Sequence, residues 1–200
     1  CDETAGKNCL VVLGVPLRKD GKLYNCAAVL HDGAILGIVP KSVLPNHGEF
    51  HEARQFASGA ENCGDGQITL RGKAVPFGLD LLFCCEELPA FVLGVEIGAD
   101  LWAPETRSTK LCLAGATVIA NPSASAELVG SADYRRMLLR TTSARLLCGY
   151  VYANAGNGES TQDAVFSGHS MICENGDMLT EKPPFADSDM ISTELDLQRL

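Results

Sequence analysis

The sequence lacks an uninterrupted apolar run of the roughly 18 residues that a membrane-spanning helix requires. Its first residues also lack the charged and apolar segments of a signal peptide. It has no cluster of Lys and Arg, and its formal net charge is -9, which disfavours nucleic acid and anionic membranes as partners. We therefore expect a cytoplasmic protein that binds a small polar substrate or another protein.

Paired cysteine motifs are also missing, although the chain has nine cysteines. Their number is odd, no Cys-x-x-Cys occurs, and no His stands at ligand spacing, so we expect no metal site of the usual zinc kinds. Several lie within apolar runs, as Cys26 and Cys148 do. We expect these side chains to be reduced thiols that pack as small hydrophobic groups.

What is present is the composition of one soluble domain, with 46% hydrophobic and 20% charged residues. Short apolar runs that do not alternate indicate strands buried on both faces. Asp32-Gly33, Gly72 and Asn175-Gly176 mark hairpin turns, and Pro16 is expected to end the first strand. The predicted strands are residues 9–15, 23–30, 34–39, a hairpin within 67–76, 81–85, 92–97, 117–122, 149–155, 165–173, 177–180 and 190–197.

Two helices are predicted among the later strands, at residues 106–114 and 132–148. In the second, residues recur at three- and four-residue spacing and predict the face that lies on a sheet, with the arginines on the other faces. Strands joined partly by helices and partly by hairpins predict an α/β fold with a mixed sheet. The residues of the predicted buried face are Tyr134, Met137, Leu138, Thr141, Ala144 and Cys148.

Long motifs carry a family resemblance. One runs from Gly94 to Asn121 and contains Gly-Val-Glu-Ile-x-x-Asp-Leu-Trp, and another runs from Ile38 to Phe56 and contains Lys41, Glu49 and Glu52. In both, the chain resembles nitrilase-superfamily amidases, or carbon-nitrogen hydrolases, and most closely the glutaminase domain of glutamine-dependent NAD synthetases. The resemblance implies an α-β-β-α sandwich with mixed sheets, a homo-oligomer paired through the outer helices, and no cofactor in this domain.

The family cleaves amides with a Glu, a Lys and a Cys. Lys41 matches the lysine, whose implied role is to stabilise developing negative charge. Gly98 stands at the position of the nucleophilic cysteine, and a glycine cannot form an acyl-enzyme. Loss of a hydrolase nucleophile costs on the order of 10⁶ in rate. Cys84, Cys85 and Cys112 are not expected to replace it, because the required geometry belongs to one turn.

The general-base Glu of the family belongs to a Phe-Pro-Glu-Leu motif that this sequence lacks. The resemblance runs from Val11 to Leu197, so we expect residues 1–200 to be a partial nitrilase-like domain without its N-terminal part, covering roughly the last two-thirds of it. The synthetase domain, which would bind ATP and the NAD precursor through a Gly-rich phosphate loop, is not present. We expect it in the parent protein.

Contacts to the substrate can be carried over by position. In the glutaminase branch, glutamine is bound by a tyrosine, a serine and a basic residue, and the matching positions here are His47, Ser125 and Ser131. Only Ser125 keeps its residue type. Trp102 is interpreted equally well as a wall of the pocket or as a buried core aromatic.

Two functions of different class remain open. In the first, the chain is a glutaminase domain that releases ammonia for a synthetase domain, with Gly98 and Ala99 as engineered substitutions. In the second, it is a non-catalytic nitrilase-fold module with an assembly or regulatory role, which the combined changes at positions 47, 98, 99 and 131 favour. An amidase of another nitrilase branch, acting on a different amide, is disfavoured because Gly158-Glu-Ser-Thr161 matches the synthetase branch.

Overall fold

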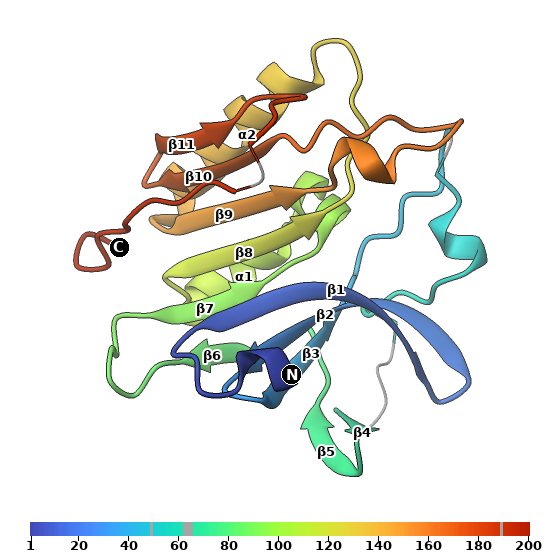
Figure 1. The fold of residues 1–200 in the computed structure, drawn as a ribbon, viewed down its shortest axis with the longest axis vertical. Coiled ribbons are helices and arrows are strands. Elements are labelled where there is room, and N and C mark those ends of the chain that lie inside the picture. The colour runs from blue at the N-terminus through green and yellow to red at the C-terminus, as the bar shows by residue number, and fades with distance from the viewer. Residues whose placement is uncertain (49, 62–65, 189) are drawn as a thin grey trace.

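Two β-sheets dominate the computed structural model, which describes residues 1–48, 50–61, 66–188 and 190–200. The first sheet is antiparallel, with β1 (Leu10–Lys19), β2 (Lys22–His31) and β3 (Ala34–Pro40) in chain order. The second has six strands in the order β11-β10-β9-β8-β7-β6 (Figure 1). These strands are β6 (Leu82–Cys84), β7 (Val92–Val95), β8 (Val118–Ser123), β9 (Gly149–Asn154), β10 (Ser170–Glu174) and β11 (Asp177–Lys182).

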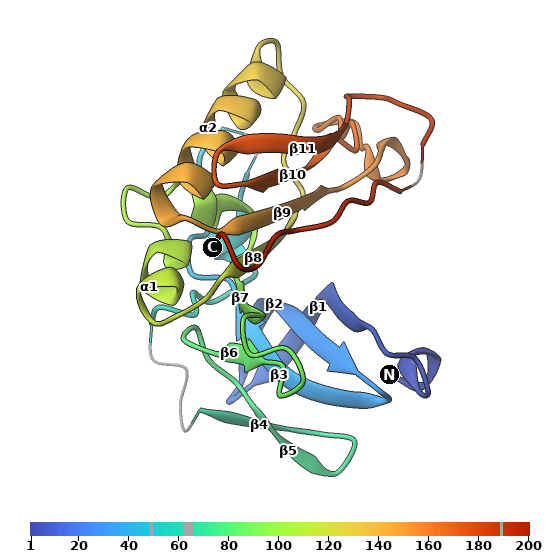
Figure 2. The same ribbon diagram turned by 90° about the vertical axis from the view of Figure 1, so that its left-hand side faces the viewer.

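The six-stranded sheet is mixed, as predicted. Its central strands β7, β8 and β9 are parallel, and β6, β10 and β11 pair antiparallel at its two sides. The parallel strands are joined by α1 (Arg107–Leu113) and α2 (Ser131–Leu146), and both helices lie on the same face of the sheet (Figure 2). No helix in the described parts of the chain has the length and apolar character needed to cross a bilayer.

Successive side chains of a strand point to opposite faces of the sheet, so the first sheet has a core on each of its faces. Ala27 and Val29 of β2 face the second sheet and pack with Leu93 and Val118, while neighbouring residues of β2 face outward. The outward face is covered by the hairpin of β4 (Gln67–Leu70) and β5 (Lys73–Pro76). From one side to the other, the described layers are helices, six-stranded sheet, three-stranded sheet and hairpin.

The predicted hairpins are confirmed at their turns. Asp32 and Gly33 have φ of +42° and +75°, and Asn175 and Gly176 have φ of +45° and +91°, which the short side chains of Asn and Asp tolerate. A further turn of the same kind joins β1 to β2 at residues 20–21, where both φ values are positive.

Several strand predictions are wrong, among them the start of the strand predicted at residues 165–173, which begins only at Ser170. The first strand continues through Pro16, which pairs with Asn25, to Lys19; β1 lies at the edge of its sheet, where a residue without an N–H is tolerated. Residues 190–197 form no strand. Leu195 and Leu197 do pack against the core between the sheets, but the intervening Asp196 N–H donates to Glu174 Oε2 at 2.6 Å instead of joining a ladder.

The predicted buried face of the second helix is only partly correct: Leu138 and Cys148 pack in the core, but other members of the predicted face do not. Tyr134 and Met137 are exposed, whereas Arg135 and Leu139 are buried together with Thr142 and Ser143. The true face is offset because an arginine occupies a core position, where it is held by buried polar partners. Apolar periodicity cannot detect such a position.

Candidate functional site

The turn after β7 is the centre of the site. Gly98 begins a 3-10 helix, η3 (Gly98–Trp102), with φ of +48°. Its N–H donates to Asn121 Oδ1 at 2.8 Å, and Asn121 Nδ2 donates back to the Gly98 carbonyl at 3.4 Å. Asn121 lies on β8, so the turn is fixed to the neighbouring parallel strand at its carboxyl end, where ligands bind in open α/β sheets.

Asp100 joins this turn to the segment after β3. Its Oδ2 accepts the Ile97 N–H at 2.9 Å, and its Oδ1 accepts the Val43 N–H and the Ser42 hydroxyl, both at 2.7 Å. The carboxylate is 1% exposed. Because a single buried group holds both segments, Lys41 is brought next to the turn that contains Gly98.

Lys41 and Glu52 form a partly buried ion pair at this point. Lys41 Nζ donates to Oε1 and Oε2 of Glu52 at 2.8 and 2.7 Å, and Lys41 is 5% exposed. A Cβ atom built on Gly98 would lie 3.7 Å from Lys41 Nζ and 3.6 Å from Ser123 Oγ. The structure thus brings Lys41 and Gly98 together, as the sequence predicts.

Glu52 begins the short 3-10 helix η2 (Glu52–Arg54). In the sequence, Glu52 is a member of the motif at residues 38–56, and no role is predicted for it. The structure adds that its carboxylate binds the ammonium group of Lys41 and lines the same cavity as Gly98. Glu49, which belongs to the same motif, lies outside the described residues.

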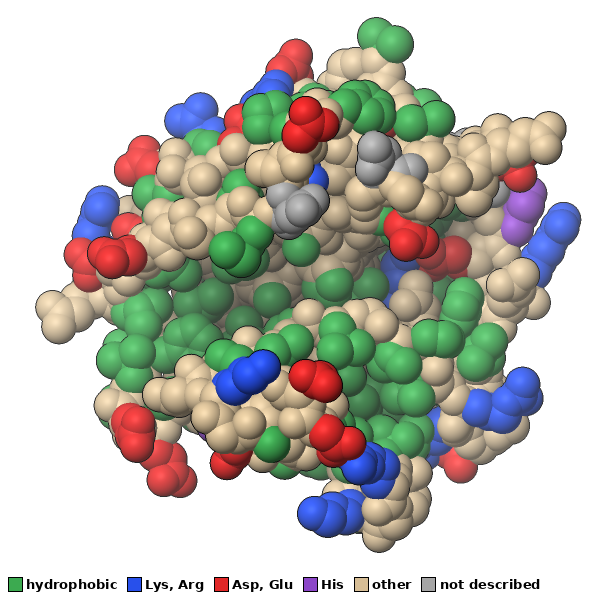
Figure 3. All heavy atoms as spheres, in the orientation of Figure 1, with side chains coloured by type: hydrophobic (Ala, Val, Ile, Leu, Met, Phe, Trp, Pro, Cys, Tyr) green, Lys and Arg blue, Asp and Glu red, His purple; other side chains and the backbone are tan. Residues whose placement is uncertain are grey.

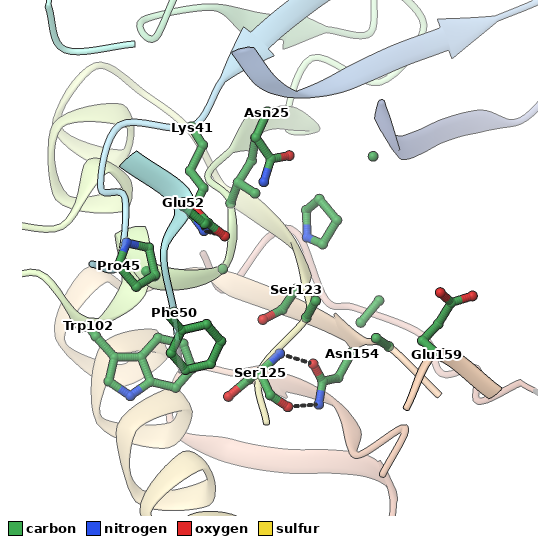
Figure 4. Close-up of a pocket in the computed structure, with 18 of the residues that line it drawn as sticks. Asn25, Lys41, Pro45, Phe50, Glu52, Trp102, Ser123, Ser125, Asn154 and Glu159 are labelled. Atoms are coloured by element: carbon green, nitrogen blue, oxygen red, sulfur yellow. Dashed lines mark hydrogen bonds and ion pairs between the residues drawn. The ribbon is translucent and has the colours of Figure 1, made fainter. Parts of the chain in front are cut away.

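Gly98 lines a cavity of about 780 Å³, and Figure 4 shows other lining residues, among them Lys41 and Trp102. Trp102 and Phe50 line one side of it, and Asn25, Ser123 and Glu159 supply polar groups. Figure 3 shows that this side of the molecule is hollowed between the layers and that hydrophobic side chains line much of the hollow. A cavity with an apolar wall and a few convergent polar groups is suited to a small polar ligand.

Two polar pairs shape the floor of the cavity. Ser125 N–H donates to Asn154 Oδ1 at 2.8 Å, and Asn154 Nδ2 donates to the Ser125 carbonyl at 3.1 Å (Figure 4). The Tyr152 hydroxyl donates to Ser123 Oγ at 3.0 Å. These bonds hold the residues that follow β8 against the end of β9, so that Ser123 and Ser125 line the cavity.

The structure brings most predicted contact residues to this cavity. Lys41, Gly98, His47, Ser125 and Trp102 all line it. Trp102 also lies beside Tyr152, with ring centroids 6.4 Å apart, so it is both a cavity wall and a packing partner.

Ser131 is not brought to the cavity. Its hydroxyl donates to Glu127 Oε1 at 2.7 Å and accepts from Arg135 Nη1 at 3.2 Å, at the start of α2. Arg135 is 1% exposed and also binds the second oxygen of Glu127. Burial raises the pKa of Glu127, but hydrogen bonds from Ser167, Ser131 and Arg135 outweigh it and hold that pKa below its ordinary value.

His169 completes this buried network. Arg135 Nε donates to His169 Nδ1 at 3.0 Å, and His169 Nε2 lies 2.8 Å from Glu181 Oε1. Because Nδ1 accepts a hydrogen bond, it carries no proton, and the ring is neutral with its proton on Nε2. Burial lowers the pKa of His169, against the opposing effect of Glu181, in agreement with that form.

A second buried network lies behind the turn. The Tyr150 hydroxyl binds Glu96 Oε1 and accepts a hydrogen bond from Asn121 Nδ2 at 3.1 Å, while Glu96 Oε2 accepts the Ser108 N–H at 2.7 Å. Burial raises the pKa of Glu96, and the bonds from Tyr150 and Ser108 only partly oppose it. The Asn121 side chain that binds Gly98 is therefore itself fixed by its hydrogen bond to Tyr150.

Ligands for a metal are not gathered in the described part of the chain, where no three His, Cys, Asp or Glu side chains form a suitable group. The cysteines there, including Cys26 and Cys148, are free thiols. Cys63 lies outside the described residues.

Comparison with known proteins identifies the family. The family model for carbon-nitrogen hydrolases matches residues 2–200. The chain belongs to this family. It is 50% identical over 176 residues to the glutamine-dependent NAD(+) synthetase of Mycobacterium bovis, covering 88% of this chain and 26% of that protein. It is 29% identical to the synthetase of the same name from Aquifex aeolicus, covering 97% and 30%.

Solved structures agree with this placement. The glutamine-dependent NAD(+) synthetase from Cytophaga hutchinsonii matches with a TM-score of 0.72 and 28% identity, over 87% of this chain and 27% of that one. A carbon-nitrogen hydrolase from Helicobacter pylori G27 has the same fold, with a TM-score of 0.67 and 20% identity over 95% and 62% of the two chains. The chain is thus a carbon-nitrogen hydrolase domain that resembles part of these synthetases. It spans about a quarter of the length of the synthetases it matches.

Proposed function

We propose that this chain is the glutamine-binding domain of a glutamine-dependent NAD synthetase, that its amide pocket is retained, and that hydrolysis through a thioester is lost. The observation that supports this most directly is the arrangement around Gly98. Lys41 Nζ and Ser123 Oγ converge on the place where a side chain would start, but glycine supplies no nucleophile there.

The remaining groups are suited to hold an amide. Lys41 would place its positive charge near the amide oxygen, and the hydroxyl of Ser123 would accept from or donate to the amide group. Glu52 orients the lysine through two hydrogen bonds. Without a thiol, the bound amide would lose the covalent route that accounts for a factor on the order of 10⁶ in hydrolases.

The whole protein is proposed to follow the relatives in carrying a synthetase domain. In that arrangement ATP and the NAD precursor would bind the other domain, and ammonia would reach it from another source or from a partner. A homo-oligomer is proposed as well. It is supported by Tyr134, Met137 and Leu147, which are exposed on and beside α2 although they are large and apolar.

Binding of L-glutamine to the full-length protein tests the retained pocket. Saturation-transfer NMR and calorimetry should show binding without formation of glutamate. Lys41→Met should weaken it, whereas Lys73→Met, a change of an exposed lysine on β5, should not. If folded protein binds no amide at all, the pocket has lost its ligand and the domain acts as a scaffold.

A further inference from the structure

Residues 158–161 match a family motif in the sequence, and the side chains of Glu159, Ser160 and Thr161 divide into two groups. Ser160 Oγ accepts the Phe166 N–H at 2.9 Å, and Thr161 Oγ1 accepts the N–H groups of Asp163 and Ala164, each at 3.2 Å. These hydroxyls build the loop. Glu159 is different, because its side chain lines the cavity.

Glu159 ends the short 3-10 helix η4 (Asn157–Glu159). Its N–H donates to the Gly156 carbonyl at 3.0 Å, which fixes the backbone. Within the described residues, no hydrogen bond or ion pair involves its carboxylate. In Figure 4 it lies across the cavity from Lys41 and Trp102.

The charges of the cavity do not cancel. Among the described residues that line it, Lys41 is the sole Lys or Arg, and both oxygens of Glu52 already bind its ammonium group. Glu159 then leaves a net negative charge. Apart from His47, the described lining residues offer no further basic side chain to a carboxylate on a ligand, since Ser131, at the position of the family's basic residue, is turned into the network of Arg135 and Glu127.

We infer that Glu159 recognises an ammonium group on the ligand, so that this pocket favours amides that carry a positive charge and disfavours amides that carry only a carboxylate. This inference rests on the proposed amide pocket. The amide end would lie at Lys41 and Ser123, and the ammonium group would lie toward Glu159. L-Glutamine, which carries both an ammonium group and a carboxylate, would be held here through its ammonium group and not through its carboxylate.

Three amides of matched length test the inference on the full-length protein: 5-aminopentanamide, which is a cation, pentanamide, which is neutral, and glutaramate, which is an anion. The cation should bind about fivefold more tightly than the neutral amide, as expected for an exposed charge contact, and glutaramate should bind most weakly. Added salt should reduce the difference.

The variant Glu159→Gln should abolish the preference for the cation, whereas Glu87→Gln, which changes an exposed carboxylate outside the cavity, should preserve it. If glutaramate binds as tightly as the cation, the charge inference is wrong while the amide pocket stands. If the preference survives in Glu159→Gln, another group recognises the ammonium and the role of Glu159 is rejected. If none of the three amides binds, the proposed pocket itself fails.

Discussion

At the scale of single residues, glycine at position 98 avoids backbone strain but offers no side chain for chemistry. Its φ of +48° lies in the left-handed region, which costs an ordinary residue about 1 kcal/mol. The space around it is sufficient, because a Cβ would meet its nearest atoms at 3.6 Å or more. Glycine therefore relaxes the turn at the position proposed for the nucleophile.

Gly98→Cys should lower the free energy of unfolding by about 1 kcal/mol, because the new residue keeps the left-handed backbone conformation. Urea denaturation measures the change. Gly98→Ala is the matched control, since it introduces the same strain without a thiol. A stabilising effect of either variant would show that the backbone at position 98 is not left-handed in solution.

Asp100 should be the most sensitive polar residue of the site. Asp100→Ala removes an acceptor shared by Ile97, Ser42 and Val43 and leaves their donors buried, so we expect a loss of about 3 kcal/mol in the free energy of unfolding. Chemical denaturation measures it, with the exposed Glu87→Ala as control. A loss below that of the control would mean that Asp100 does not hold the Lys41 segment.

Glu96 should make stability depend on pH. Burial raises its pKa in the folded protein, so the folded state keeps the proton at pH values where the unfolded chain, with an ordinary pKa of about 4.3, has lost it. The stabilising contribution of this group is therefore complete at low pH and decreases as the pH rises above that value.

Unfolding of wild type and Glu96→Gln, followed in urea at a series of pH values, tests this. The stability of the variant relative to wild type should rise with pH, because glutamine does not ionise. Glu127, whose pKa is lowered, should contribute in the opposite direction, with stability lost as the pH falls. A pH-independent difference between wild type and Glu96→Gln would contradict the raised pKa.

At the scale of elements, α2 depends on its buried arginine. Arg135→Met leaves the Glu127 carboxylate and His169 without their central partner, and we expect a loss of about 3–5 kcal/mol. Arg136→Met on the same helix breaks ion pairs that are partly exposed, which should cost less than about 1 kcal/mol. Thermal and urea unfolding of the two variants should separate them clearly; equal effects would show that Arg135 is not a core residue.

The elements that could be predicted are those set by local chemistry. Asp-Gly and Asn-Gly fixed the hairpins because few other pairs accept positive φ at both positions. The full face of α2 could not be predicted, because Arg135 is buried through partners that lie outside the helix, at residues 127 and 169. Residues 190–197 alternate like a strand, yet tertiary contacts of Leu195 and Leu197 replace the ladder.

At the scale of the whole molecule, the site is assembled from separate segments. Motif recognition predicted that Lys41, Gly98 and Ser125 belong together, and the structure brings them to one cavity. Motif recognition could not predict the position of Ser131, because the Ser131 hydroxyl is bound by Glu127 and Arg135. Nor could it give Glu159 a role, because its contribution depends on which charges already neutralise each other across the cavity.

The most direct test of the account is ammonia release from L-glutamine by the full-length protein, measured with the native Gly98-Ala99 and with Gly98→Cys combined with Ala99→Glu. The account predicts no release above the uncatalysed rate from the native protein and glutamine-dependent release from the double variant. Steady release of ammonia and glutamate by the native protein, lost on Lys41→Met, would contradict it, because the pocket would then hydrolyse amides without a nucleophile at position 98.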